Sequence, residues 1–112
     1  MPTVERLKRR ADFLAAATEM KAPTAGFILQ VRKRGDQGPG RVGFTVARKV
    51  GNAVERNRVR RRLKEMVRLA AATGLPDGND YVLVGRRAAL SLPFEQIAHD
   101  FKRALGRLRV PT

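Results

Sequence analysis

Arginine and lysine are concentrated in one stretch of this chain, from Arg48 to Lys64. The stretch holds eight cations in seventeen residues and a single acid, Glu55. A guanidinium group pairs with phosphate through two parallel hydrogen bonds, and a lysine neutralises phosphate as a point charge. Solvated helix faces usually carry both signs of charge, so an array this one-sided favours a polyanionic partner. The residue types therefore indicate phosphate binding.

Asn57 adds a second kind of chemistry to this stretch. It stands between two arginines and offers both a donor and an acceptor, which suits a base edge or a 2′-hydroxyl group. Solvent exposure or a local polar contact is the alternative for Asn57, and pairing within the protein is the alternative for Arg56.

Residues for protein catalysis are not found. Hydrolysis by a protein needs a nucleophile, an acid and a base, or a bound metal. The chain has no cysteine, and its one histidine, His99, is expected to face solvent on the last helix. Asp77 and Asp80 flank Gly78 and are expected to form a turn. We therefore expect no catalytic residue, no metal site and no cofactor in the protein.

A helix is expected to position the cations. Asn52 is suited to the N-cap, and Glu55 occupies the acidic position of a capping box. Apolar residues recur at helical spacing on one face, namely Val59, Leu63, Met66 and Ala70. The helix should bury this face and end near Thr73, with Gly74 as its C′ residue. The cations then project from the opposite side.

The rest of the chain predicts an α/β (α+β) two-layer sandwich around a small mixed sheet. The expected elements are a basic arm at 1–10, a helix at 11–20, a linker at 21–26, strands at 27–34 and 41–50, the basic helix, a strand at 80–85 and a helix from Pro93. The first two strands are expected to pair as an antiparallel hairpin across a Gly- and Pro-rich loop. The strand at 80–85 should run parallel to the second strand, because the basic helix connects them.

Composition narrows the function further. The 112 residues carry a net charge of +14 with a sequence pI near 11.7, which favours nucleic acid as the partner of a single RNA-binding domain, 1–112. No signal-like segment or membrane-length apolar run is present, so a cytoplasmic location is expected. An anionic membrane surface ranks lower, because the basic helix lacks bulky residues opposite its cations.

A groove for single-stranded RNA is also expected. Gln30 and Arg32 share one face of the strand at 27–34, and Phe13 on the first helix could lie opposite them. An aromatic side chain above a cationic floor is a common platform for unpaired bases. The alternative for Phe13 is ordinary core packing.

The stretch from Arg41 to Glu65, RVGFTVARKVGNAVERNRVRRRLKE, closely resembles the signature of the bacterial ribonuclease P protein component. Arg56-Asn57-Arg58 matches the RNR core of that family, and Lys49 to Val54 matches the preceding K-x-G-x-A-V pattern. Looser similarity covers RLKRRADF, FILQV and DYVLVGRRA. The resemblance thus extends over most of the chain. Matched to the motif, it implies RNA-binding roles for Arg48, Lys49, Arg56, Asn57, Arg58, Arg60, Arg61 and Lys64.

The resemblance implies the small subunit of a ribonucleoprotein endonuclease that removes the 5′ leader of precursor tRNA. A large RNA subunit would perform the catalysis with Mg²⁺, and the protein would be monomeric apart from its RNA partners. It also implies a left-handed crossover between the parallel strands. The implied leader cleft is made by Phe13, Ala17, Gln30 and Arg32. Ala17 and Gln30 stand where the family commonly has aromatic residues, which weakens base stacking there.

Two other functions are compatible with so basic a chain. One is an RNA-binding module without a role in catalysis, such as a ribosomal protein or an RNA chaperone. The other is a free-standing protein nuclease, which the absence of a recognisable catalytic group disfavours.

Overall fold

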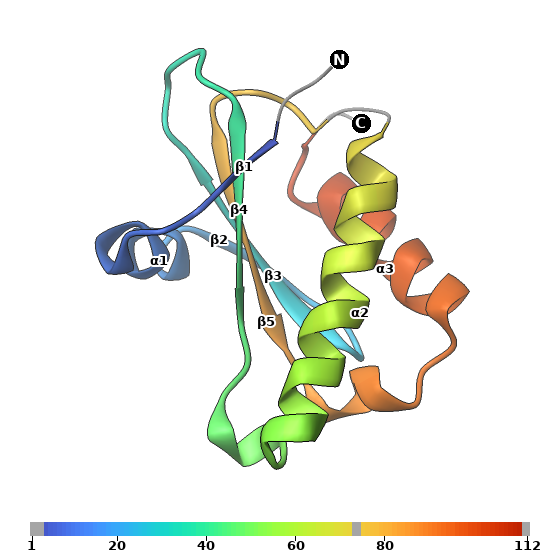
Figure 1. The fold of residues 1–112 in the computed structure, drawn as a ribbon. Coiled ribbons are helices and arrows are strands. Elements are labelled where there is room, and N and C mark those ends of the chain that lie inside the picture. The colour runs from blue at the N-terminus through green and yellow to red at the C-terminus, as the bar shows by residue number, and fades with distance from the viewer. Residues whose placement is uncertain (1–3, 73–74, 111–112) are drawn as a thin grey trace.

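Five strands and three α-helices form the part of the chain that the computed structural model describes, residues 4–72 and 75–110 (Figure 1). The strands are β1 (Val4–Arg6), β2 (Met20–Pro23), β3 (Phe27–Lys33), β4 (Gly40–Thr45) and β5 (Asn79–Gly85). The helices are α1 (Arg10–Ala17), α2 (Ala53–Ala71) and α3 (Phe94–Arg107), with 3₁₀ turns η1 (Arg48–Val50) and η2 (Arg87–Leu90). The predicted α+β class is confirmed.

The strands form one mixed sheet in the order β1-β4-β5-β3-β2. β5 is central, parallel to β4 and antiparallel to β3. The parallel pairing of the second predicted strand with the third is confirmed. The predicted hairpin is wrong, because β5 lies between β3 and β4. A strand with apolar side chains on both faces gains most from the centre of a sheet, and Val82 and Leu83 of β5 are almost completely buried.

The helices cover both faces of the sheet. α1 lies on one side, and α2 packs beside α3 on the other (Figure 1). The chain passes from β4 through α2 to the parallel strand β5. In Figure 1 the β4 strand lies in front of β5 with α2 beside them, so this connection turns in the left-handed sense that the resemblance implies. It departs from the usual right-handed rule.

The larger core lies between the sheet and the pair α2–α3. Phe27, Leu29 and Val31 alternate along β3 and are fully buried there, as period-two spacing requires. The ring of Phe27 meets Phe101 of α3 edge to face, with centroids 6.2 Å apart. A Cβ atom at Gly85 would lie 2.7 Å from Val59, so glycine lets α2 approach the central strand closely.

The N-terminal region is more ordered than the sequence predicts. Val4–Arg6, expected in a basic arm, pairs with β4 in parallel as strand β1. The first helix ends at Ala17, because the Thr18 hydroxyl donates to the Ala15 carbonyl oxygen at 2.9 Å and closes the last turn. Met20–Pro23, expected as the end of that helix and a linker, is the edge strand β2 instead.

The basic helix forms as predicted. The amide of Glu55 donates to the Asn52 side chain at 2.8 Å, and the amide of Asn52 donates to the Glu55 carboxylate at 3.0 Å, which completes a capping box. α2 ends at Ala71, and the expected C-terminal residues Thr73 and Gly74 lie outside the described residues. The predicted last helix is present, but it begins at Phe94 rather than at Pro93, which is its N-cap residue.

Replacement of Leu63 by alanine tests the packing of α2 against the sheet. Leu63 is fully buried between α2 and the sheet. Its truncation should lower the free energy of unfolding by about 2–5 kcal/mol, through lost apolar contact and the cavity that remains. Urea denaturation measures this loss. Leu69→Ala on the same helix is the matched control, because Leu69 is 49% exposed; equal losses in the two variants would contradict this packing.

Candidate nucleic-acid interface

Glu55 is the one acid in the cationic stretch, and its carboxylate is hydrogen-bonded within the fold. Its carboxylate accepts from the N-cap amide and from Arg87, whose Nη2 lies 3.0 Å from Oε2. Arg87 also donates to the Val50 carbonyl oxygen at 2.7 Å. The hydrogen bond from Arg87, followed by that from the Asn52 amide, holds the pKa of Glu55 below its ordinary value. The acid that could offset the nearby cations is thus committed to the start of α2.

Two arginines of α2 serve the fold. Arg62 donates to the carbonyl oxygens of Ala89 and Leu92 at 2.5 and 2.6 Å and ties the helix to η2. Arg56 donates to the Gly51 carbonyl oxygen at 3.0 Å. Arg56 therefore makes the contact within the protein that was its alternative.

The other predicted residues of this stretch form an exposed surface, which we call the α2 cationic face. Asn57 accepts a hydrogen bond from Arg60 at 2.8 Å, so its local polar contact is also confirmed. Asn57, Arg60, Arg61 and Lys64 line a shallow hollow of about 410 Å³ together with Val54, which is 75% exposed. The cations of this face whose side chains form no hydrogen bond or ion pair with another described residue are Arg48, Lys49, Arg58, Arg61 and Lys64.

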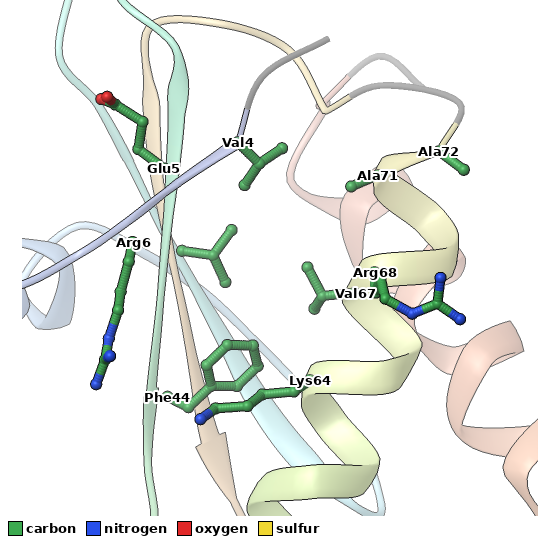
Figure 2. A pocket seen from close by; sticks show the side chains of 10 residues that line it. Val4, Glu5, Arg6, Phe44, Lys64, Val67, Arg68, Ala71 and Ala72 are labelled. Carbon is green, nitrogen blue, oxygen red and sulfur yellow. The ribbon is translucent and has the colours of Figure 1, made fainter. Parts of the chain in front are cut away.

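A second hollow adjoins this face. It lies between β1, β4 and the C-terminal half of α2, has a volume of about 550 Å³, and is mainly apolar (Figure 2). Lys64 and Phe44 both line it, and Figure 2 shows the lysine side chain extending across the hollow beside the ring. Long lysine side chains often cover apolar surface with their methylene groups while the ammonium group stays in water. Lys64 therefore borders both hollows of α2.

A separate hollow, the α1 cavity, lies on the opposite face of the sheet and has a volume of about 450 Å³. Three residues predicted for the leader cleft line it: Phe13, Ala17 and Gln30. Leu14, which is 55% exposed, adds apolar surface. The structure thus brings together residues from a helix and a strand that the sequence placed opposite each other.

Two cations at this cavity were missed by the sequence analysis. Lys8, which precedes α1, and Arg10, the first residue of α1, both line it. The available signal was their position in the basic run just before Phe13. Arg32, by contrast, does not line the cavity. Its Nη1 lies 3.4 Å from Asp12 and 3.8 Å from Asp80, so its charge is directed into the protein.

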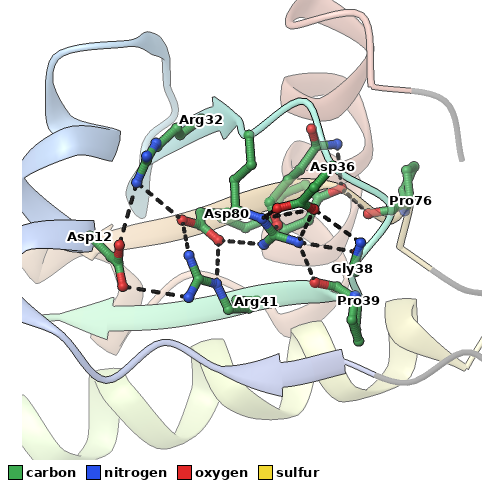
Figure 3. A network of polar contacts seen from close by, with 11 residues as sticks. Asp12, Arg32, Asp36, Gly38, Pro39, Arg41, Pro76 and Asp80 are labelled. Carbon is green, nitrogen blue, oxygen red and sulfur yellow. Dashed lines mark hydrogen bonds and ion pairs between the residues drawn. The ribbon is translucent and has the colours of Figure 1, made fainter.

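Asp80 is the centre of a buried ion network rather than a turn former (Figure 3). Its carboxylate accepts two hydrogen bonds from Arg41, at 2.7 and 2.8 Å, and one from Arg34 at 2.7 Å. Burial disfavours the charged form, but the hydrogen bonds from Arg41 and Arg34 outweigh it and keep the pKa of Asp80 below its ordinary value of 3.8. The sequence offered no local signal for this network, because its members lie on separate strands.

The other residues considered for protein chemistry lie on the surface. His99 is exposed on α3 and Asp77 is exposed in the loop before β5, as expected. Within residues 4–72 and 75–110, no three of the possible ligand side chains lie close enough together to hold a metal ion. No helix among the described residues is long and apolar enough to cross a membrane.

Comparison with known proteins identifies relatives of this chain. The family model described as Ribonuclease P matches residues 1–109. The ribonuclease P protein component of Gluconacetobacter diazotrophicus is 45% identical over 106 residues, covering 94% of this chain and 91% of that protein. The corresponding protein of Ruegeria pomeroyi is 46% identical over 112 residues, covering 94% and 86%.

Solved structures have the same fold. The RNase P protein from Thermotoga maritima aligns with a TM-score of 0.75 at 29% identity, covering 92% of this chain and 96% of that one. The Staphylococcus aureus RNase P protein aligns with a TM-score of 0.77 at 24% identity, covering 94% and 95%, which supports the fold alone.

The Asp80 network should make stability depend on acid pH. Because the pKa of Asp80 is lowered in the folded protein, its contribution is complete above about pH 4 and is lost as the pH falls through the folded value. Asp80→Asn should cost about 3–5 kcal/mol at pH 7, because it removes the fully buried anion that pairs with two partly buried arginines. Its stability should then fall less steeply on acidification.

Urea denaturation between pH 2 and 7 checks both expectations. Asp77→Asn is the matched control, because it removes an exposed aspartate three residues away. Parallel acid limbs for the wild type and Asp80→Asn would show that Asp80 does not contribute the pH dependence.

Proposed function

The chain belongs to the ribonuclease P protein family, whose role lies in tRNA processing, and we propose that it is the protein subunit of the ribonuclease P ribonucleoprotein. In this proposal the α2 cationic face binds the catalytic RNA near the cleavage region. The α1 cavity receives the single-stranded 5′ leader of precursor tRNA. The RNA subunit carries out the hydrolysis with Mg²⁺, and the protein supplies affinity and position.

The observation that carries this proposal is the separation of the free cations from the structural ones. Arg62 is turned onto carbonyl oxygens of the fold, whereas Arg58, Arg61 and Lys64 have no anionic partner among the described residues. Phosphate groups would supply those partners, and release of their counterions would drive binding. The capping box fixes the direction of the helix that presents this array.

The leader assignment rests on the lining of the α1 cavity. Phe13 and Leu14 offer apolar surface to a base, while Lys8 and Arg10 lie where a backbone phosphate could follow. Only Phe13 and Phe44 among the lining residues are aromatic. This implies modest stacking, because each stacked base is worth about 1–3 kcal/mol. The two cations add affinity that does not depend on base identity.

Reconstitution tests the function directly. Cleavage of a precursor tRNA that carries a 5′ leader should be measured at low Mg²⁺ with the protein alone, a bacterial ribonuclease P RNA alone, and both together. Efficient cleavage at the mature 5′ end is expected only from the mixture. If the mixture is no faster than the RNA alone while the protein still binds RNA, a general RNA-binding module becomes the better assignment. Cleavage by the protein alone would indicate a free-standing nuclease.

Removal of two free cations should weaken binding of the catalytic RNA and flatten its salt dependence. For Arg58→Gln/Arg61→Gln, the slope of log affinity against log salt should become less steep by about 1.4–1.8, at 0.7–0.9 per lost phosphate contact. Filter binding over a salt series measures it. Lys102→Gln/Arg103→Gln removes two exposed cations from α3 as the matched control; an equal change there would indicate general attraction rather than a specific face.

A further inference from the structure

Asp12 of α1 stands beside Phe13 in the sequence but faces the sheet. Its two carboxylate oxygens lie 3.4 Å from Nη1 of Arg32 and 3.5 Å from Nη1 of Arg41 (Figure 3). The side chain is 17% exposed. Asp12 thus connects α1, the helix that carries Phe13, to two arginines on two different strands.

Both arginines also contact the carboxylate of Asp80 on β5. Arg41 forms two hydrogen bonds with the fully buried carboxylate of Asp80, and Arg32 lies 3.8 Å from the same carboxylate. The alternating charges therefore run from the central strand β5 through the arginines to α1. Bidentate arginine–carboxylate pairing is geometrically restrictive, so the guanidinium group that Asp12 meets is held in a defined orientation.

α1 has few other means of attachment. It spans eight residues, and Arg9 at its N-cap makes no side-chain capping bond. Its apolar contacts belong to a small cluster in which Leu7, Ala16 and Val82 are buried. Isolated helices of this length are unstable in water, so the tertiary contacts must hold it. The contact through Asp12 is a substantial part of what is available.

The position of the Phe13 ring is restricted by close contact with β4. A Cβ atom at Gly43 of β4 would come within 2.5 Å of Cε1 of the Phe13 ring, so the ring rests directly over the glycine. Phe13 has space in this position only while α1 keeps its present height and rotation above the sheet. A small shift of the helix would move the ring out of the wall of the α1 cavity.

From these contacts we infer that Asp12 is a positioning residue for leader binding. Through Arg41 and Asp80 it fixes α1 on the sheet, and so it holds Phe13 in the wall of the cavity. Asp12 does not touch the RNA in this assignment. The inference rests on the proposed function, because it takes the α1 cavity as the leader site.

The charge change and the positioning role predict opposite effects of an Asp12 substitution on RNA affinity. Loss of a carboxylate makes the protein more positive, and electrostatics alone would then tighten RNA binding. The positioning role predicts the opposite. With the protein assembled on ribonuclease P RNA, Asp12→Asn should weaken affinity for a leader-bearing precursor tRNA by about threefold or more, a fraction of one stacked base. Affinity for the same tRNA without its leader should stay unchanged.

Asp36→Asn is the matched control. Asp36 pairs with Arg34 at 3.0 Å at the far end of the same network and is exposed. Its loss changes net charge equally but leaves α1 attached, so leader affinity should not fall. An equal loss in both variants, or tighter binding by Asp12→Asn, would overturn the assignment.

A double-mutant cycle with Phe13→Ala separates positioning from direct contact. If Asp12 acts through the ring, Asp12→Asn should cost little leader affinity in the Phe13→Ala background. Additive losses would overturn the inference. Failure of the underlying function is distinguishable, because the wild-type assembly would then show equal affinity for tRNA with and without a leader.

Hydrogen exchange on the free protein provides a readout without RNA. Asp12→Asn should increase exchange at the amides of α1 and leave the amides of β5 protected, whereas Asp36→Asn should change neither. Loss of protection throughout β5 would mean that Asp12 supports the whole fold, and it would overturn the specific role.

Discussion

Mutual repulsion among twenty-four lysines and arginines is the constraint that this fold must satisfy, since ten acids cannot balance them. The protein meets it in part by using some carboxylates more than once. Asp80 serves Arg34 and Arg41 together, while Glu55 both caps α2 and receives Arg87. Backbone carbonyl oxygens take further guanidinium groups. Several cations without such partners lie on α2, among them Arg58, Arg61 and Lys64, and they form part of the surface that we propose binds RNA.

The features that sequence reasoning predicted are those set by near neighbours. The capping box of Asn52 and Glu55 involves residues three apart, and the buried stripe of α2 follows helical spacing. Phe27, Leu29 and Val31 recur with a period of two along one strand, and all three are buried together. Such patterns are fixed before any distant segment is brought into contact.

The features that it missed depend on which strands become neighbours. A turn-rich loop between two strands favours a hairpin, yet the apolar strand β5 takes the place between β3 and β4. That choice brings Arg32 opposite Asp80 in the β3–β5 register and Arg41 opposite Asp80 in the β4–β5 register. Arg32 then turns from the expected cleft to a buried carboxylate. The pairing of β5 with β3 and β4 thus explains both the difference in strand order and the absence of Arg32 from the lining of the α1 cavity.

The central place of β5 also has a consequence for the order of assembly. β4 pairs with β1 on one side and β3 pairs with β2 on the other, and β5 joins these two halves. β5 comes after α2 in the chain, so during synthesis the strands before it exist as two pairs with no strand to join them. The cationic helix leaves the ribosome before the sheet that supports it can close. A chain cut short before Asn79 would expose apolar strand faces and unpaired arginines at once, a combination prone to aggregation.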